Sequence, residues 1–375
     1  MAKDKKKHSK EKSKHDILTD DSLEFLRSYI NNASPVGFEA KGQKLWLDYL
    51  QPYVDTHFVD PYGTAVGVIN PSEPFKVVIE AHADEISWFV NYINDQGLIY
   101  LKRNGGVDHQ VAPAKRVIIH GKKGQVKAVF GWPAIHTRLA SSEQKEPQPK
   151  VENLFLDCGA RNKKEVEELG IHIGAVVTYE EGFDELAYDY YIGRALDNRI
   201  GGFMIAEVAR LLKENKKKLP FGLYVVNAVQ EEVGLRGAEM IARRIKPNVA
   251  IITDVTHDTQ TPMINKTIEG DVACGKGPSP AYGPAVHNKL LSFVQDVAEK
   301  NEIQLQMRTV SRSTGTDTDS FAYANDGCPS VLISIPLRYM HTTVEMIHKK
   351  DIESTIRLMY ETVLALTPTT NLSYL

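Results

Sequence analysis

Cysteine is scarce in this 375-residue sequence, which contains only Cys158, Cys274 and Cys328. The three are far apart, odd in number and outside any CxxC pattern, so neither a disulfide framework nor a zinc site made of thiolates is expected. So few cysteines suit a reducing compartment, and we expect a cytoplasmic protein. No stretch approaches 18 uninterrupted apolar residues, so we expect no transmembrane span and no membrane partner.

A dominant charge of one sign is also absent. Lys and Arg number 45 against 48 Asp and Glu, so the net charge is −3 and no broad basic field exists to hold a nucleic acid. Residues 1–16 nevertheless hold seven Lys against three acidic residues, which leaves −7 on the remainder. We expect this basic tail to be disordered, because so charged a run buries too little apolar surface to offset its ordering entropy. A solvated tail is the simpler interpretation, and binding to a membrane surface or to RNA is the alternative.

Buried strands and amphipathic helices alternate along most of the chain. Strands are expected at 64–69, 75–80, 221–229, 249–253 and 330–335. Helices are expected at 22–32, 43–50, 197–213, 290–301 and 351–366. This alternation predicts an α/β fold in which a mixed, mainly parallel sheet is sandwiched by helices.

Between residues 87 and 189 the pattern changes to short strand-like runs separated by glycine. Such runs occur at 98–102, 116–119, 125–130 and 175–178. We therefore predict a small β domain inserted into the α/β domain. The expected organisation is a tail at 1–16, a main domain at 17–86 and 190–375, and an inserted domain at 87–189.

Acidic and imidazole side chains follow the predicted strands. In chain order they are His82, Asp84, Glu231, Glu232, Asp254 and His341. Asp197 stands at the start of the predicted helix 197–213. Because ligands of open α/β sheets lie beyond the carboxyl ends of the strands, we expect these side chains to share one crevice.

Two imidazoles and three carboxylates without thiolates suit a pair of divalent cations with one carboxylate bridging them. Glu231, turned away from its neighbour Glu232 if the strand continues, would be free to act as a general base. Asp84 is placed to accept the second N–H of the His82 ring and to set its tautomer. Each feature alone has an ordinary alternative: a chance HxD pattern, a solvated Glu-Glu face, or a helix cap at Asp254.

Taken together, six stretches resemble the TET-type, or glutamyl and deblocking aminopeptidase, family of co-catalytic dinuclear metallopeptidases. They are AHADEIS (81–87), GRALDNRIGG (193–202), AVQEEVGLRGA (228–238), ITDVT (252–256), TGTDTDSF (314–321) and PLRYMHTTVEM (336–346). The resemblance covers nearly all of the chain after the tail. It implies a zinc-peptidase-like catalytic domain with an inserted β-barrel-like domain.

The resemblance also implies roles for single residues. His82 and Asp254 would hold one metal ion, Glu232 and His341 the other, and Asp197 would bridge them. Glu231 matches the general base of the family and Asp84 its histidine-orienting aspartate. The two ions would be zinc, cobalt or manganese. Gly315, Thr316 and Asp317 are expected in the wall of the substrate pocket, although a plain turn is the alternative for this cluster.

The implied activity is removal of N-terminal residues from short peptides. The implied assembly is a homo-oligomer, a tetrahedral dodecamer built from dimers through the inserted domain. A related dinuclear hydrolase, such as a carboxypeptidase or an N-deacetylase, is the alternative, and a glycan hydrolase or a non-catalytic particle fits less well. His257 departs from the family pattern, and we interpret it as a bystander rather than an additional ligand.

Overall fold

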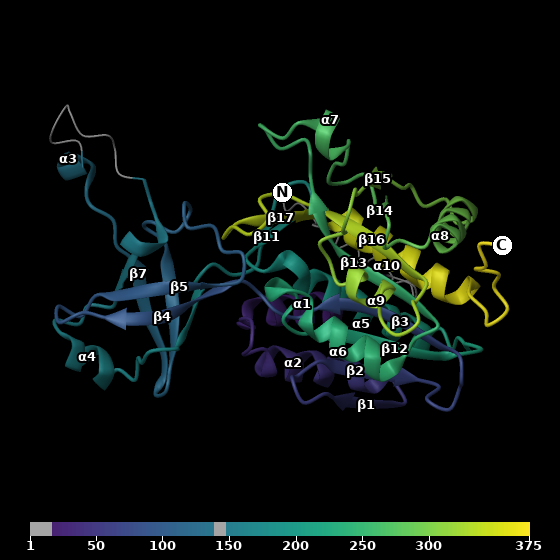
Figure 1. Ribbon diagram of the computed structural model, residues 1–375, viewed down its shortest axis with the longest axis horizontal. Coiled ribbons are helices and arrows are strands. Elements are labelled where there is room, and N and C mark those ends of the chain that lie inside the picture. Colours follow the sequence, from purple (N-terminus) through teal and green to yellow (C-terminus); the bar gives the residue numbers. More distant parts are fainter. Residues whose placement is uncertain (1–16, 139–147) are drawn as a thin grey trace, which may run out of the picture.

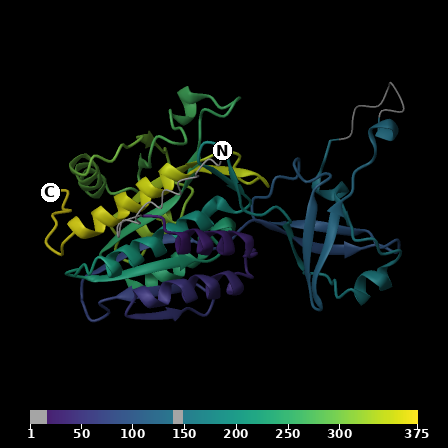
Figure 2. The same ribbon diagram turned by 180° about the vertical axis from the view of Figure 1, so that it is seen from behind.

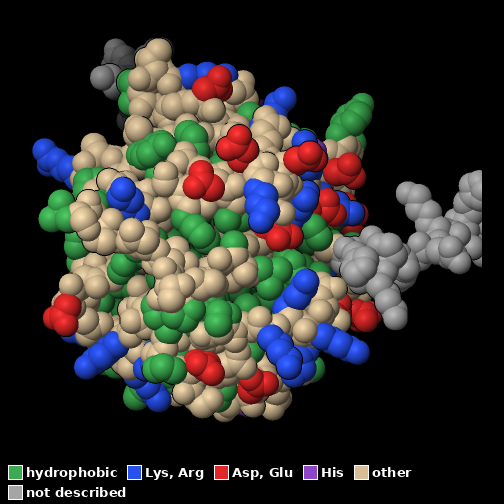
Figure 3. Space-filling view, turned by 90° about the vertical axis from the view of Figure 1, so that its right-hand side faces the viewer, with side chains coloured by type: hydrophobic (Ala, Val, Ile, Leu, Met, Phe, Trp, Pro, Cys, Tyr) green, Lys and Arg blue, Asp and Glu red, His purple; other side chains and the backbone are tan. Residues whose placement is uncertain are grey.

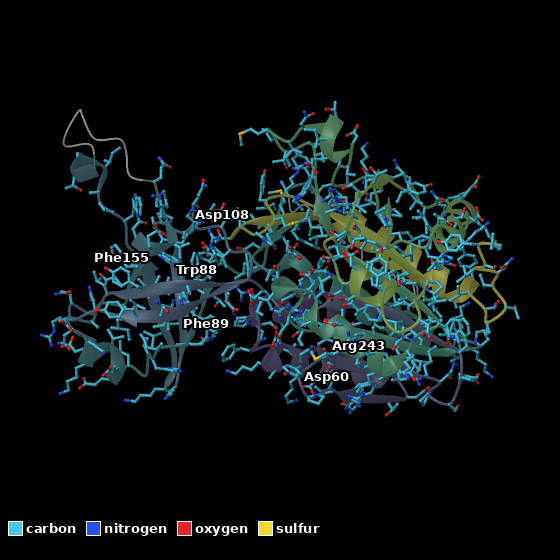
Figure 4. The ribbon with its side chains drawn as sticks, viewed as in Figure 1. Asp60, Trp88, Phe89, Asp108, Phe155 and Arg243 are labelled. Carbon is cyan, nitrogen blue, oxygen red and sulfur yellow. The ribbon has the colours of Figure 1, made fainter. Side chains whose placement is uncertain are left out.

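The computed structural model describes residues 17–138 and 148–375. The basic tail predicted at residues 1–16 lies outside this described part. An α/β body and a separate β-barrel lie side by side along the long axis of the molecule (Figure 1). Trp88 and Phe155 lie in the barrel, whereas Asp60 and Arg243 belong to the body (Figure 4).

The body is built on one mixed sheet of eight strands. In spatial order these are β1 (Thr56–Val59), β2 (Ala65–Ile69), β12 (Gly222–Ala228), β3 (Lys76–His82), β13 (Val249–His257), β16 (Ser330–Leu337), β14 (Ser279–Tyr282) and β15 (Arg308–Thr309). The central strands β12, β3, β13 and β16 run parallel to one another, and antiparallel pairs flank them. All eight residues of β16 are buried, as expected of a strand covered on both faces.

Helices cover the sheet on both sides. They are α1 (Asp20–Asn31), α2 (Ala40–Leu50), α5 (Leu196–Glu214), α6 (Arg236–Ile245), α8 (Asn288–Lys300), α9 (Thr318–Ala322) and α10 (Lys349–Ala365). Seen from behind, α1, α2 and α10 lie in front of the sheet (Figure 2). These layers confirm the predicted fold class.

Helix α5 is the central helix of the body, since it packs on β3 and is itself covered by α1, α2 and α10. Every residue from Leu196 to Leu212 is buried. Four of these residues are charged: Asp197 and Arg199 near the start of the helix, and Glu207 and Arg210, which pair at 2.7 Å. A helix buried on all sides keeps a charge only when it is paired in this way.

The inserted segment forms a closed six-stranded barrel. In order around the barrel its strands are β4 (Ser87–Ile93), β5 (Ile99–Asn104), β8 (Phe155–Asp157), β7 (Gly124–Phe130), β6 (Arg116–Gly121) and β9 (Val176–Tyr179). Trp88 fills the barrel core and stacks edge-on against Phe130, with 5.5 Å between ring centroids. The inserted β domain expected from the glycine-punctuated pattern, and the barrel implied by the family resemblance, are confirmed.

The remaining elements are short. They are α3 (Ile135–Arg138), α4 (Lys163–Glu168), α7 (Lys266–Glu269), the 3-10 turns η1 (Gln51–Tyr53), η2 (Val151–Asn153) and η3 (Glu231–Val233), and a three-stranded sheet of β10 (Asp184–Leu186), β11 (Tyr190–Gly193) and β17 (Glu345–His348). The small sheet joins the segment that leaves the barrel to the segment that follows β16. On the face in Figure 3, positive and negative side chains are interspersed.

Candidate metal centre

The predicted site residues meet at the carboxyl edge of the parallel strands. His82 is the last residue of β3, Asp254 lies in the second half of β13, and His341 follows β16. Because β12, β3, β13 and β16 are neighbours and run in one direction, their carboxyl ends open into the same crevice. Asp197 enters this crevice from the non-helical start of α5, where its φ is −79° and its ψ is 113°.

Asp197 lies between the two histidines. Its Oδ1 is 3.2 Å from Nε2 of His82, and its Oδ2 is 3.3 Å from Nε2 of His341. His82 Nε2 is also 3.9 Å from Oδ1 of Asp254, and His341 Nε2 is 3.3 Å from Oε1 of Glu232. One carboxylate oxygen thus faces each imidazole, which is the arrangement a bridging ligand requires.

In the part of the chain that the structure describes, three groups of residues have potential ligand atoms within 4.8 Å of one another. They are His82, Asp197 and Asp254; Asp197, Glu232 and His341; and His82, Glu231 and Glu232. The first two groups share Asp197 and correspond to the two predicted metal positions. Imidazole nitrogens and carboxylate oxygens suit divalent cations such as zinc, cobalt and manganese, so the residues fit the implied metal pair.

Asp84 contacts the site in two ways. Its Oδ1 is 3.4 Å from Nδ1 of His82, the direction expected for a group that orients the ring. Both its oxygens also accept backbone N–H groups, from Glu231 at 3.0 Å and from Glu232 at 3.1 Å. Asp84 therefore also holds the turn that carries the two glutamates, a role that the sequence did not indicate.

The chain does not continue as a strand up to Glu231. Strand β12 ends at Ala228, Gln230 adopts a left-handed conformation with φ +59°, and Glu231 begins the 3-10 turn η3. The orientation of Glu231 is thus set by a turn and not by strand alternation. Its Oε2 still reaches to 3.8 Å from Nε2 of His82, so the side chain faces the centre.

The barrel also contributes to the site. Nδ1 of His341 donates to the carbonyl oxygen of Gly106 at 3.2 Å, which leaves Nε2 to face Asp197 and Glu232. Gly106 belongs to the loop after β5, and a Cβ there would lie 3.0 Å from the His341 ring. A larger residue at this position would therefore have to displace the His341 ring by a few tenths of an ångström.

Crowded, buried carboxylates give the site unusual electrostatics. Burial, reinforced by neighbouring carboxylates, raises the pKa of Asp254 to about 7 and that of Glu231 to about 11. Burial alone would lower the pKa of His341, but its contacts with Asp197 and Glu232 raise that pKa to about 12. Without cations, protons must offset this repulsion.

The metal-free protein is therefore expected to lose thermal stability as the pH rises from about 4 to about 7. Asp254 has an ordinary pKa of 3.8 and a folded pKa of about 7, so the native state binds more protons than the unfolded state in this window. The stability contributed by protonated His341 likewise decreases as the pH rises above 6.5 towards its raised folded pKa, because the unfolded state loses a proton that the native state keeps.

The measurement is the melting temperature of chelator-treated protein between pH 4 and 8, where we expect a decrease of several degrees. Saturating cobalt should remove most of this dependence, because cations favour the ionised carboxylates. A melting temperature that rises across the window without metal would contradict the electrostatic account.

A cavity of about 1090 Å³ opens above the centre. Gly315 and Thr316 line it, as does His257, which is exposed and is not in any of the three donor groups. Asp317 is absent from the wall because its side chain is buried, 1% exposed, behind the cavity.

The carboxyl groups of Asp317 and of Glu80 in β3 lie close together and are both buried, and in the described part of the chain no other group donates a hydrogen bond to them. Burial raises the pKa of Glu80 to about 8 and that of Asp317 well above its usual range, so one of the two retains a proton. The sequence did not indicate that these two residues meet. The only sign of the pair is a glutamate that directly follows the apolar residues Val77, Val78 and Ile79.

A mixed α/β sheet with such a donor set at its carboxyl edge defines the class of metal-dependent peptidases. Within that class, the chain belongs to the M42 glutamyl aminopeptidase family, whose model matches residues 63–358. It is an aminopeptidase of the metallopeptidase type, and the resemblance found in the sequence is confirmed.

Relatives cover nearly the whole chain. The lysyl aminopeptidase of Pyrococcus furiosus is 33% identical over 89% of this chain and 94% of the relative. The TET aminopeptidase from a marine sediment Thaumarchaeota archaeon is 30% identical, with a TM-score of 0.89 over 94% of this chain and 98% of that one. The Pyrococcus horikoshii TET1 peptidase, described as able to assemble into a tetrahedron or a large octahedral shell, is 25% identical, with a TM-score of 0.80 over 92% and 100%.

The described part of the chain contains no helix with the length and apolar character needed to cross a membrane.

Proposed function

We propose that this aminopeptidase uses two divalent cations to release N-terminal residues from short peptides. The observation that carries the proposal is the position of Asp197, whose two carboxylate oxygens face His82 and His341 separately. His82, Asp197 and Asp254 would hold one cation, and Asp197, Glu232 and His341 the other. Such a pair lowers the pKa of water and polarises a carbonyl oxygen.

Glu231 is the proposed general base. It lines the cavity, its carboxylate faces the centre, and the contact between Asp84 and its backbone N–H holds it there. We infer that Glu231 accepts a proton from the attacking water and donates it to the amine that leaves. Bound cations would lower its pKa from the raised value that burial and neighbouring carboxylates give it in the metal-free protein, which leaves it ionised to accept this proton.

The excess of carboxylates supports selectivity for a free N-terminus. Glu231, Glu232 and Asp254 all line the cavity beside the proposed cations, and together they would attract the α-ammonium group of a peptide. An internal peptide segment has no such charge. The metal in use is proposed to be zinc, cobalt or manganese, since the donor set accepts each of them.

The proposal is tested by incubating metal-loaded protein with a library of short peptides and identifying the products by mass spectrometry. Stepwise loss of N-terminal residues, abolished by chelator and restored by zinc, cobalt or manganese, is the expected result. Loss from the C-terminus, or release of acetate from N-acetylated substrates, would replace the proposal with the carboxypeptidase or the deacetylase alternative.

The cavity wall suggests which side chains are preferred. Arg308 of β15 is the sole Lys or Arg among the described lining residues. Its Nη2 donates to Oγ of Ser334 at 2.8 Å, and Ser334 is the register partner of Asp254. Nε of Arg308 has no hydrogen-bond partner in the described part of the protein, so the donors of this guanidinium are only partly used. A guanidinium of this kind in the cavity wall can bind a substrate carboxylate.

Arg308→Gln is therefore expected to lower kcat/KM for reporters with an N-terminal Glu by about 10- to 100-fold relative to Leu reporters, the range of one charged hydrogen bond. Arg308→Lys keeps the positive charge but lacks the paired N–H donors of the guanidinium. Its relative kcat/KM for Glu reporters should therefore lie between that of the unmodified protein and that of Arg308→Gln. An unchanged Glu-to-Leu ratio would show that the guanidinium does not contact the N-terminal side chain.

We further propose that residues 17–86 and 190–375 form the catalytic domain and that residues 87–189 form a dimerisation domain. The TET1 relative supports assembly of such dimers into a tetrahedral dodecamer. Light scattering of the purified chain tests this, and a monomer at micromolar concentration would contradict it. The three free cysteines support a cytoplasmic location.

A further inference from the structure

One buried carboxylate outside the ligand set contacts the backbone of two proposed ligands. Glu345 is the first residue of β17 and is 2% exposed. Its Oε2 accepts the backbone N–H of Asp197 at 3.0 Å, and its Oε1 accepts that of His341 at 2.9 Å. The bridging ligand and the terminal ligand of the second position are thus tied to one side chain.

The loop that carries His341 has an unfavourable backbone conformation, which the hydrogen bond to Glu345 stabilises. Arg338 and Met346 close it with reciprocal backbone hydrogen bonds of 2.9 and 3.1 Å. Within it, Tyr339 and His341 both have φ +61°, a left-handed conformation that is unfavourable for residues other than glycine. The hydrogen bond from the His341 N–H to Glu345 holds the backbone in this conformation at the ligand itself.

Glu345 also supplies an acceptor for the backbone N–H of Asp197. Asp197 precedes the regular part of α5, and its N–H has no helical partner there. Glu345 is anchored opposite Gly193 in the small sheet of β10, β11 and β17. That sheet therefore connects the two segments that present Asp197 and His341.

We propose that Glu345 is a positioning residue that sets the distance between Asp197 and His341 and thereby the affinity of the second cation position. This inference rests on the proposed dinuclear centre and adds a residue that contacts neither cation. Loss of a hydrogen bond that orients a metal ligand typically weakens metal binding by about 10- to 100-fold. We expect the same loss of affinity, about 10- to 100-fold, for the cation at the second position, which we take to be the weaker of the two binding steps.

The test is a titration of the metal-free full chain with Co²⁺, followed by visible absorption, which reports the coordination of each ion. Glu345→Gln keeps the size of the side chain but leaves one backbone N–H facing an amide NH₂ group. Glu345→Asp keeps the charge but is too short to reach both amides. Glu185→Gln is the matched control, because Glu185 lies in the same small sheet and its side chain is 57% exposed.

Both Glu345 variants are expected to weaken the second Co²⁺ step by at least tenfold and to alter its absorption band, while Glu185→Gln matches the unmodified protein. Saturating Co²⁺ should then restore peptidase turnover in the Glu345 variants with KM unchanged. Two unaltered binding constants in a folded Glu345 variant would overturn the inference. If Glu345→Gln does not fold, as judged by near-ultraviolet circular dichroism, Glu345→Asp alone decides.

Co²⁺ binding and peptide hydrolysis by the unmodified protein distinguish a failure of this inference from a failure of the proposed function. Two bound Co²⁺ ions without peptide hydrolysis would contradict the proposed function and leave the role of Glu345 intact. Fewer than two bound ions at saturation would overturn both.

Discussion

Glu231→Gln is expected to lower turnover by about 10²- to 10⁴-fold, the range found for loss of a general base. Glutamine has the same size, so the side chain keeps its place 3.8 Å from His82 Nε2, but it cannot accept the proton of the attacking water. Binding of two cations should persist, because neither proposed metal position relies on Glu231. The measurement pairs kcat on a peptide reporter with a Co²⁺ titration.

Glu239→Gln provides the matched control for this variant. Glu239 lies on the exposed surface of α6, shortly after η3, and pairs with Arg243 at 2.6 Å. It should retain full turnover. If Glu231→Gln instead loses a cation, Glu231 acts as a ligand, as the third donor group of His82, Glu231 and Glu232 allows. Full turnover in Glu231→Gln would remove it from the mechanism.

Asp197→Asn is expected to abolish both metal binding and activity, with kcat/KM falling by about 10³-fold or more, as for other changes that remove catalytic stabilisation outright. Among the residues that the structure describes, Asp197 is the carboxylate within 4 Å of both histidines, through Oδ1 to His82 and Oδ2 to His341. Asparagine retains one oxygen and no charge, so at most one of the two positions keeps a weakened ligand.

His341→Ala is the comparison variant, because we expect it to lose only part of the bound metal. It removes a ligand of the second position only, so the position formed by His82, Asp197 and Asp254 should still bind one cation. Elemental analysis after dialysis against zinc should give about one ion per chain for His341→Ala and fewer for Asp197→Asn. Equal metal content in the two variants would argue against a bridging role for Asp197.

Much of the fold could be predicted because burial leaves a local signature. The apolar run FKVVIE matches β3, and the strand expected at 330–335 lies within β16. Strands covered on both faces are recognised by continuous β-branched and apolar residues, whatever their partners are. The inserted β domain was recognisable for a similar reason, since glycine-bounded short strands leave little room for helices, whereas its closure into a barrel was implied only by the family resemblance.

Several parts of the site could not be predicted. Glu231 was expected on a continuing strand, but the left-handed Gln230 ends the strand and starts a turn. The hydrogen bonds from Glu231 and Glu232 to Asp84 join positions about 150 residues apart, and the contact of Gly106 with His341 spans 235 residues. Local patterns contain no information on which distant backbone amide a carboxylate will meet.

The sequence by itself determined the chemistry of the site: which imidazoles and carboxylates are available, and that they follow buried parallel strands. Tertiary structure alone decided that Asp197 turns one oxygen to each histidine, that Asp317 is buried beside Glu80, and that the barrel supplies a contact to His341. The physical reason is that side-chain chemistry and strand burial are encoded locally. Distances between ligands depend on sheet register and loop packing, which arise only when remote segments come together.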